Sequence, residues 1–210
     1  MTLIVYLHGF RSSPQSIKAR AMVRHVEAMP QADRPRLVVP DLGHAPSAAI
    51  AKVLDLVRGH AGPLAFVGSS LGGYYATHLA ERLGARAVMI NPAIRPYVDL
   101  APYRGVQTNL YSGESFEVTD AHFDELRALA VPRITRPERY FLLVQSGDEV
   151  LDWREAVAHY AGAFQLVQGG GDHAFQAFEA QIPAILRFAA ASATPGSDKN
   201  PTPVRSEGSD

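Results

Sequence analysis

The 210-residue chain contains no cysteine. It therefore has no disulfide framework, no thiolate nucleophile and no cysteine-based zinc or iron-sulfur site. Charge of either sign is not in excess, because 20 Lys and Arg residues stand against 21 Asp and Glu residues, for a formal net charge of -1. A chain so balanced carries no electrostatic signature for nucleic acid or for an anionic membrane, and a small neutral partner is favoured.

Long hydrophobic runs are also missing. No uninterrupted apolar stretch approaches the roughly 20 residues of a membrane span. The apolar start of the chain has no basic residue before it and meets a turn at His8-Gly9, so it lacks the anatomy of a signal peptide. With 47% hydrophobic and 20% charged residues, the composition is that of a globular protein, which we expect to be soluble and cytoplasmic.

Strand-like apolar runs alternate with helix-like runs along most of the chain. This alternation is typical of a parallel sheet with helices on both faces. The runs are continuously apolar, which favours strands that are covered on both sides. Six strands are predicted, at Leu3–Leu7, Leu37–Pro40, Leu64–Val67, Ala87–Ile90, Tyr140–Val144 and Phe164–Val167. We expect a reduced, mostly parallel α/β sheet in the order 2-1-3-4-5-6.

Between the strands, apolar residues recur at helical spacing. Ile50, Val53, Leu54 and Val57 form the stripe of a helix packed on a sheet, and Gly59 is placed to end it. Further helices are predicted over 15–29, 71–83, 152–161 and 179–191, and a helical segment carries Phe123, Leu126 and Leu129 on one face.

Two segments break this alternation. The segment from about residue 93 to residue 138 contains several prolines and aromatic residues. This composition predicts a short cap-like insertion over one edge of the sheet. Residues 192–210 have almost no large apolar groups and cannot offset their ordering entropy, so we predict a disordered C-terminal tail. The main domain is then expected to span residues 1–191.

A glycine-flanked serine follows the third predicted strand. Gly68-Ser69-Ser70-Leu71-Gly72 has the pattern Gly-x-Ser-x-Gly and leads into the next predicted helix. The pattern is typical of a nucleophile elbow, a turn so tight that Gly68 and Gly72 must be small while the Ser70 hydroxyl is presented above the sheet. A glycine-rich turn without catalytic function is the alternative interpretation.

A serine hydroxyl becomes a good nucleophile only beside a general base that a third group orients. In chains with this elbow, the acid follows a late strand and the histidine follows the last strand. Asp148 follows the fifth predicted strand and His173 follows the sixth. We therefore predict a Ser70-Asp148-His173 catalytic triad.

Two other carboxylates are close to Asp148 in the sequence. Glu149 is its direct neighbour, and Asp152 immediately precedes the helix that begins near Trp153. Asp152 is better placed to cap that helix than to orient a histidine.

An oxyanion hole requires two N–H donors near the nucleophile. Leu71, directly after Ser70, supplies one backbone N–H. The loop after the first strand reads His8-Gly9-Phe10, and its His-Gly-x form predicts the Phe10 N–H as the second donor. We expect His8 to brace this loop.

Three residues are candidates for lining the substrate pocket: His8, Arg95 and Tyr97. Arg95 is also interpretable as a surface residue and Tyr97 as part of the insertion's own core. The remaining histidines show neither His-x-x-x-His nor carboxylates at ligand spacing, so we predict no metal site.

Five segments together are characteristic of one family. They are Tyr6-Leu7-His8-Gly9-Phe10 with Ser12-Ser13-Pro14, Gly68-Ser69-Ser70-Leu71-Gly72-Gly73-Tyr74-Tyr75-Ala76, Ile90-Asn91-Pro92-Ala93 with Arg95-Pro96-Tyr97, Gly147-Asp148-Glu149-Val150-Leu151-Asp152, and Gly170-Gly171-Asp172-His173-Ala174-Phe175. Over about residues 3–190 the chain resembles the YqiA/YcfP-like family of bacterial α/β-fold hydrolases, usually described as esterases. The resemblance implies an α/β-hydrolase fold, a Ser70-Asp148-His173 triad, hydrolysis of carboxylic esters or thioesters, and no cofactor.

The expected function is a serine esterase that cleaves esters of small or medium acyl groups through an acyl-enzyme. Two alternatives stay open: an acyl-CoA thioesterase with the same triad, and a non-catalytic binding module on the hydrolase scaffold. No sequence pattern indicates the leaving group, the acyl length or an oligomeric state.

Overall fold

The computed structural model describes residues 1–191, and the predicted disordered tail at 192–210 lies outside the described residues. A six-stranded sheet forms its centre, and all neighbouring strands are parallel. The strands are β1 Leu3–Leu7, β2 Arg36–Val38, β3 Leu64–Ser69, β4 Arg86–Ile90, β7 Tyr140–Gln145 and β8 Phe164–Gln168. Their order in the sheet is β2-β1-β3-β4-β7-β8, which confirms the strand order predicted from the sequence.

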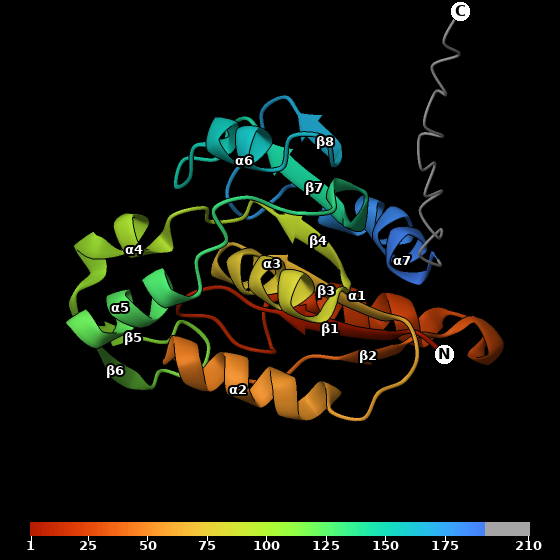
Figure 1. Ribbon diagram of the computed structural model, residues 1–210, viewed down its shortest axis with the longest axis horizontal. Helices are drawn as coiled ribbons and strands as arrows, with labels where there is room; N and C mark the ends of the chain where they lie inside the picture. Colours follow the sequence, from red (N-terminus) through yellow and green to blue (C-terminus); the bar gives the residue numbers. More distant parts are fainter. Residues whose placement is uncertain (192–210) are drawn as a thin grey trace, which may run out of the picture.

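Seven α-helices surround this sheet in the described part of the chain (Figure 1). They are α1 Ile17–Ala28, α2 Pro46–Val57, α3 Leu71–Leu83, α4 Pro96–Asp99, α5 Asp120–Ala128, α6 Trp153–His159 and α7 Ile182–Ala190. Short 3-10 turns occupy η1 Gln31–Asp33, η2 Ala101–Tyr103, η3 Pro137–Arg139 and η4 Phe178–Gln181. The sequence predicts all of the α-helices except α4, which is a single turn. The predicted helix at 179–191 begins as η4 and becomes an α-helix only at Ile182.

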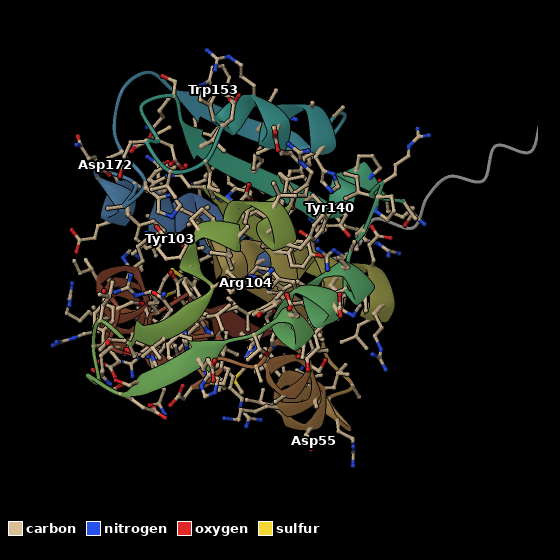
Figure 2. The ribbon with its side chains drawn as sticks, turned by 90° about the vertical axis from the view of Figure 1, so that its left-hand side faces the viewer. Asp55, Tyr103, Arg104, Tyr140, Trp153 and Asp172 are labelled. Atoms are coloured by element: carbon tan, nitrogen blue, oxygen red, sulfur yellow. The ribbon has the colours of Figure 1, made fainter. Side chains whose placement is uncertain are left out.

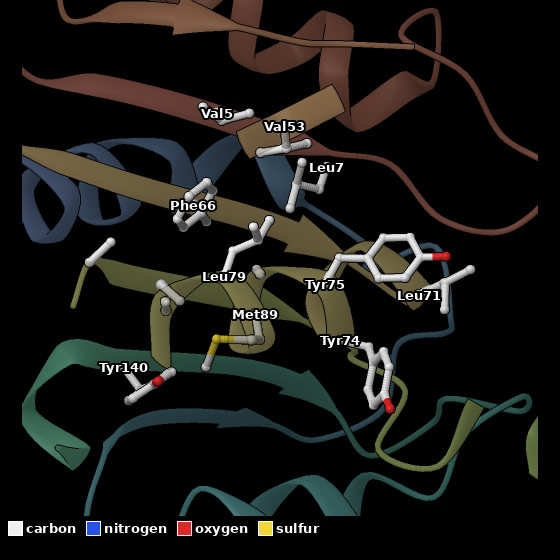
Figure 3. Packing of buried hydrophobic residues seen from close by; sticks show 14 of the residues in the cluster. Val5, Leu7, Val53, Phe66, Leu71, Tyr74, Tyr75, Leu79, Met89 and Tyr140 are labelled. Carbon is white, nitrogen blue, oxygen red and sulfur yellow. The ribbon is translucent and has the colours of Figure 1, made fainter. Parts of the chain in front are cut away.

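The central strands are buried on both faces because each face carries its own hydrophobic layer. Phe66 and Val67 point to opposite sides of β3, since side chains alternate along a strand, and both are 0% exposed. Phe66 belongs to the layer under α2, α3 and α6 (Figure 3), whereas Val67 belongs to the layer under α1 and α7. Truncating such a fully buried phenylalanine to alanine costs about 3–5 kcal/mol. The two layers therefore fix the sheet that carries the site.

The prediction of strands covered on both faces is wrong for the edges of the sheet. On β8, the side chain of Phe164 is 59% exposed and that of Val167 is 44% exposed. On β2, no residue is fully buried. These two strands lie at the edges of the sheet, and the helices that cover its centre do not fully cover their side chains.

The insertion between β4 and β7 contains a β-hairpin that the sequence does not predict. Its strands β5 Gly105–Thr108 and β6 Ser115–Val118 pair antiparallel. Phe116 and Val118 point inward from β6 and pack with Phe123 of α5 and with Phe10 from the loop after β1. Figure 1 shows α4, α5 and the hairpin gathered at one end of the sheet. The insertion is thus anchored to the loop of Phe10, a residue whose N–H the sequence predicts as an oxyanion-hole donor.

The carboxyl ends of the parallel strands meet at this same end of the molecule, which Figure 2 views directly. In the sheet, β2 lies on one side of β1, and β3 with the later strands lies on the other side. The order in which the chain adds strands to the sheet therefore reverses at β1. Ligand sites of open α/β sheets lie at the carboxyl ends of strands where such a reversal occurs. Leu7 pairs with Gly68 there, which sets the loop after β1 directly beside the turn after β3.

Candidate active site

Ser70 occupies a strained turn between β3 and α3. Its backbone has φ 56° and ψ -122°, a conformation that non-glycine residues rarely adopt. A Cβ on Gly68 would lie 2.0 Å from the Gly72 carbonyl oxygen, and a Cβ on Gly72 would lie 2.0 Å from the carbonyl oxygen of Leu7. Both flanking positions therefore require glycine, as the elbow pattern predicts, and the turn is held against the end of β1.

The structure brings Ser70, His173 and Asp148 into one hydrogen-bonded chain. Ser70 Oγ lies 3.1 Å from His173 Nε2. On the other side of the ring, His173 Nδ1 lies 3.0 Å from Asp148 Oδ1 and 2.9 Å from Asp148 Oδ2. Groups separated by 103 and 25 positions in the sequence thus meet in the arrangement that a nucleophile, its base and the base's orienting group require.

The two alternative carboxylates have other partners. Glu149 Oε2 accepts a hydrogen bond from the backbone N–H of His173 at 3.1 Å, so it supports the histidine loop rather than the ring. Asp152 Oδ1 accepts from the backbone N–H of Arg154 and caps α6. Asp148 is therefore the carboxylate that faces the imidazole.

Asp148 is buried, with 2% of its side chain exposed, and yet it is held in the ionised form. Burial raises its pKa, but the hydrogen bonds from His173 and from the backbone N–H groups of Leu151 and Val150 together outweigh burial and hold its pKa below the ordinary value. A carboxylate facing Nδ1 favours the tautomer with its proton on Nδ1. His173 Nε2 is then free to accept a proton from Ser70.

Two backbone N–H groups are open beside Ser70. Leu71 is the first residue of α3, where an N–H has no acceptor within its own helix. Phe10 lies on the adjoining loop after β1. Within residues 1–191, neither N–H donates to another protein group. Both are available to a bound molecule.

His8 ties this loop to the loop after β2. Its Nε2 accepts from the backbone N–H of Leu42 at 3.2 Å, so its Nδ1 carries the proton and donates to the Gly9 carbonyl at 3.1 Å. The ring is 2% exposed, and burial lowers its pKa and keeps it neutral. Because the C=O and N–H of one peptide point in opposite directions, the bond to the Gly9 carbonyl fixes the direction of the Phe10 N–H.

A groove of about 190 Å³ adjoins these groups. Its apolar lining residues include Phe10, Leu71, Tyr75 and Phe116, and the ring of His44 stacks on Phe116 at 4.8 Å between centroids. Polar side chains lie around it: His8, Arg11, Ser13, Asp41, Asn109, Ser112 and Glu114.

Arg95 and Tyr97 are not among the residues that line this groove. Arg95 forms an ion pair with Glu155 of α6, where the opposite charge holds it at the surface. Tyr97 is half-buried between the insertion and the α3 layer, with the guanidinium of Arg127 5.9 Å from its ring centre. Of the three candidates, His8 does line the groove.

Larger hollows occur elsewhere and are remote from Ser70. One of about 650 Å³ lies between residues 132–137 and the end of α6, and another of about 720 Å³ lies near Met1 and α7. Like the groove of about 190 Å³, they are lined by no member of the Ser70-His173-Asp148 chain; unlike that groove, they are also not lined by Phe10 or Leu71, the residues whose backbone N–H groups are open. In the described part of the chain, no group of three or more His, Asp or Glu side chains is arranged to hold a metal ion. No helix among residues 1–191 has the length and apolar character that a membrane crossing requires.

The strand order, the elbow and the convergence of loops at the carboxyl edge define a protein of the α/β-hydrolase fold. Solved structures with this fold are similar over most of their length. A protein of Agrobacterium vitis classed as a hydrolase is 22% identical, with a TM-score of 0.68, and the match covers 90% of this chain and 87% of that one. Est1E from Butyrivibrio proteoclasticus, solved with ferulic acid, is 14% identical with a TM-score of 0.64, over 90% and 88% of the two chains. A monoacylglycerol lipase of Paleococcus ferrophilus is 13% identical with a TM-score of 0.64, over 89% and 93%.

A match to a protein family identifies the chain more specifically than these similarities of fold. The sequence pattern of the uncharacterised protein family UPF0227 matches residues 3–190. The chain belongs to this family, which is the YqiA/YcfP family inferred from its sequence motifs.

Proposed function

We propose that the protein is a serine esterase that hydrolyses carboxylic esters through an acyl-enzyme. The observation that carries this proposal is the continuous hydrogen-bonded chain from Ser70 Oγ through both nitrogens of His173 to Asp148. Similar folds in Est1E, solved with bound ferulic acid, and in a monoacylglycerol lipase support ester chemistry on this scaffold.

In the first step, Ser70 Oγ attacks the ester carbonyl carbon while His173 Nε2 takes the hydroxyl proton. The carbonyl π electrons move to oxygen and form a tetrahedral oxyanion. Asp148 stays ionised and stabilises the imidazolium that forms. Its depressed pKa suits this function, because the carboxylate is harder to protonate than an ordinary aspartate.

The oxyanion is stabilised by the N–H groups of Phe10 and Leu71. Donors fixed before the reaction need no reorganisation when the charge develops, and losing one such donor typically costs about 10²- to 10³-fold in turnover. His8 serves this step indirectly, because its hydrogen bond to the Gly9 carbonyl holds the Phe10 peptide in place.

Collapse of the tetrahedral intermediate breaks the bond to the leaving alcohol, which receives the proton from His173 Nε2. The acyl group is then bound to Ser70 Oγ. Water repeats the sequence: His173 removes its proton, the carbonyl carbon accepts its oxygen, and Ser70 leaves with the proton restored. The products are a carboxylic acid and an alcohol, and the enzyme is regenerated.

The groove beside Phe10 and Leu71 supports acyl groups of small or medium size. Its volume of about 190 Å³ is below the roughly 300–1,000 Å³ of pockets that enclose drug-sized ligands. The two carboxylates that line it, Asp41 and Glu114, outnumber the one guanidinium, that of Arg11, and this excess of negative charge disfavours a polyanionic leaving group such as coenzyme A. Simple neutral esters are therefore favoured over acyl-CoA thioesters.

A fluorophosphonate probe tests the nucleophile. We expect one covalent adduct, mapped by mass spectrometry to Ser70, and loss of the adduct in Ser70→Ala. The same substitution should lower turnover of p-nitrophenyl acetate by on the order of 10⁴- to 10⁶-fold. Ser69→Ala is the matched control, since it removes the neighbouring hydroxyl and should leave labelling at Ser70 intact.

Other outcomes separate the alternatives. A folded protein that forms no adduct and cleaves no ester over a series of acyl lengths would contradict the esterase proposal and favour a binding module. A higher kcat/KM for an acyl-CoA than for a simple ester of the same acyl group would instead identify a thioesterase.

A further inference from the structure

His173 has to cross most of the sheet to reach Ser70. Ser70 follows β3, whereas His173 follows β8, and β4 and β7 lie between these strands. Three strand spacings of about 4.8 Å separate β3 from β8 by roughly 14 Å. The loop after β8 must therefore run back over the carboxyl ends of β7 and β4. What holds it there determines where the imidazole lies.

Asn91, the residue after β4, holds the middle of this loop. Its side-chain Nδ2 donates to the Asp172 carbonyl at 2.9 Å and to the His173 carbonyl at 3.3 Å. Its Oδ1 accepts from the backbone N–H of Gln145 at 3.0 Å. Asn91 is 2% exposed and has φ 40°, a left-handed conformation that asparagine tolerates better than most residues.

Gln145, the last residue of β7, holds both ends of the same segment. Its Oε1 accepts from the backbone N–H groups of Asp172 at 3.2 Å and Gln176 at 2.8 Å. Its Nε2 donates to the Gln176 carbonyl at 2.9 Å. Gln145 is 5% exposed, and a Cβ on Gly171 would lie 2.0 Å from its Oε1, so the loop packs directly on this amide.

The loop needs such support because its backbone is strained. Phe175 and Ala177 have φ of 63° and 55°, although neither is glycine. Residues held in sparsely populated conformations persist only where their surroundings enforce them. The Lys18 ammonium adds a contact from α1, donating to the Ala174 carbonyl at 2.8 Å.

We propose that Asn91 and Gln145, here called the amide clamp, are positioning residues for catalysis: they hold residues 172–176 so that His173 Nε2 stays within hydrogen-bond distance of Ser70. This inference rests on the proposed esterase function. The amide clamp touches no substrate and acts through the backbone of the histidine loop. Because Asn91 also binds the backbone of Gln145, the two strand ends and the loop form one hydrogen-bonded unit.

Two uncharged variants remove the amide clamp one half at a time. Asn91→Gly deletes the side-chain amide at a position whose φ suits glycine, and Gln145→Met keeps the length of the side chain while removing its hydrogen bonds. Gln165→Met is the matched control. Gln165 Nε2 donates to two backbone carbonyls, those of Val157 and Tyr160, and it lies away from the histidine loop.

Turnover of p-nitrophenyl acetate should be measured per fluorophosphonate-titrated site, so that unfolded protein does not count. We expect kcat to fall by about 10- to 100-fold in each clamp variant, with KM changed by less than about twofold, because a 1 Å misplacement of a catalytic group costs up to about 100-fold. The control should keep both constants. Folded clamp variants with the kcat of the wild type would overturn the proposal.

A second readout does not depend on ester hydrolysis. The low-field proton resonance of His173 Nδ1–H, assigned by its loss in His173→Gln, reports the bond to Asp148. It should be sharp in the wild type and in Gln165→Met, and broadened or lost in the clamp variants. If the wild type cleaves no ester, the proposed function fails, yet this resonance still tests the amide clamp: an unchanged signal in Asn91→Gly and Gln145→Met overturns it.

Discussion

Gly72→Ala offers a sharp test of how the elbow and the oxyanion site depend on each other. A Cβ at this position would lie 2.0 Å from the Leu7 carbonyl oxygen, 2.6 Å from the Leu7 carbonyl carbon and 2.7 Å from the His8 carbonyl oxygen. All three are backbone atoms, so no side-chain rotation can relieve the contact. To reach a tolerated separation of 3.0 Å, the start of α3 and the end of β1 must move apart by about 1 Å.

That movement separates the two proposed oxyanion donors, since Leu71 belongs to α3 and Phe10 to the loop after β1. We expect kcat to fall by about 100-fold, the cost typical of a 1 Å misplacement or of one lost donor. Overpacking should lower the free energy of unfolding by about 1–3 kcal/mol. In a chain of this size, each kcal/mol lowers Tm by roughly 2–4 °C.

The measurements are p-nitrophenyl acetate turnover per titrated site and thermal unfolding followed by circular dichroism. Gly169→Ala is the matched control, because no heavy atom lies within 4 Å of its Cβ position and its φ is not left-handed. It should keep kcat and change the free energy of unfolding by no more than about 1 kcal/mol. Wild-type kcat and Tm in Gly72→Ala would refute the reasoning.

Two further predictions concern the groups that orient the site. The pKa of Asp148 is depressed in the folded protein, so its ionised form contributes stability at pH above its ordinary value of 3.8, and this contribution is lost as the pH falls through the lower folded pKa. Asp148→Asn should therefore lose less stability than the wild type between neutral pH and pH values below 3.8 in urea titrations, and parallel curves would contradict the assignment. His8→Phe leaves the Gly9 carbonyl without its donor and should lower kcat by about 10-fold at nearly constant KM; a change in KM alone would show that His8 binds substrate instead.

Much of the fold and the convergence of Ser70, His173 and Asp148 follow from local patterns. Continuous apolar runs predict the central strands because both faces are covered, and their alternation with helices leaves few possible orders. Parallel strands carry their following loops to one edge, so Ser70, Asp148 and His173 can be placed together from chain order alone. The glycines of the elbow are dictated by contacts that recur wherever a strand turns so tightly into a helix.

The hairpin β5–β6 could not be predicted in this way. Each strand has four residues and only alternate side chains of β6 are buried, so the pattern repeats too few times to stand out. Val106 on β5 is 74% exposed, whereas a valine in a strand is expected to be buried. The position of Arg95 is equally nonlocal, because its partner Glu155 is 60 residues away.

The amide clamp shows why sequence motifs do not identify polar residues that support a site through the backbone. Gln145 ends a buried strand, where a polar residue is expected as the chain leaves the core, yet its side chain is 5% exposed. A buried amide must satisfy both its donors and its acceptor, and the strand that carries it cannot supply them. For Gln145 these partners come from the Gln168 side chain on the neighbouring strand β8 and from a segment of backbone that lies over the strand end. In this protein that segment is the loop of His173. The buried amides at the ends of β4 and β7 thereby position the proposed base.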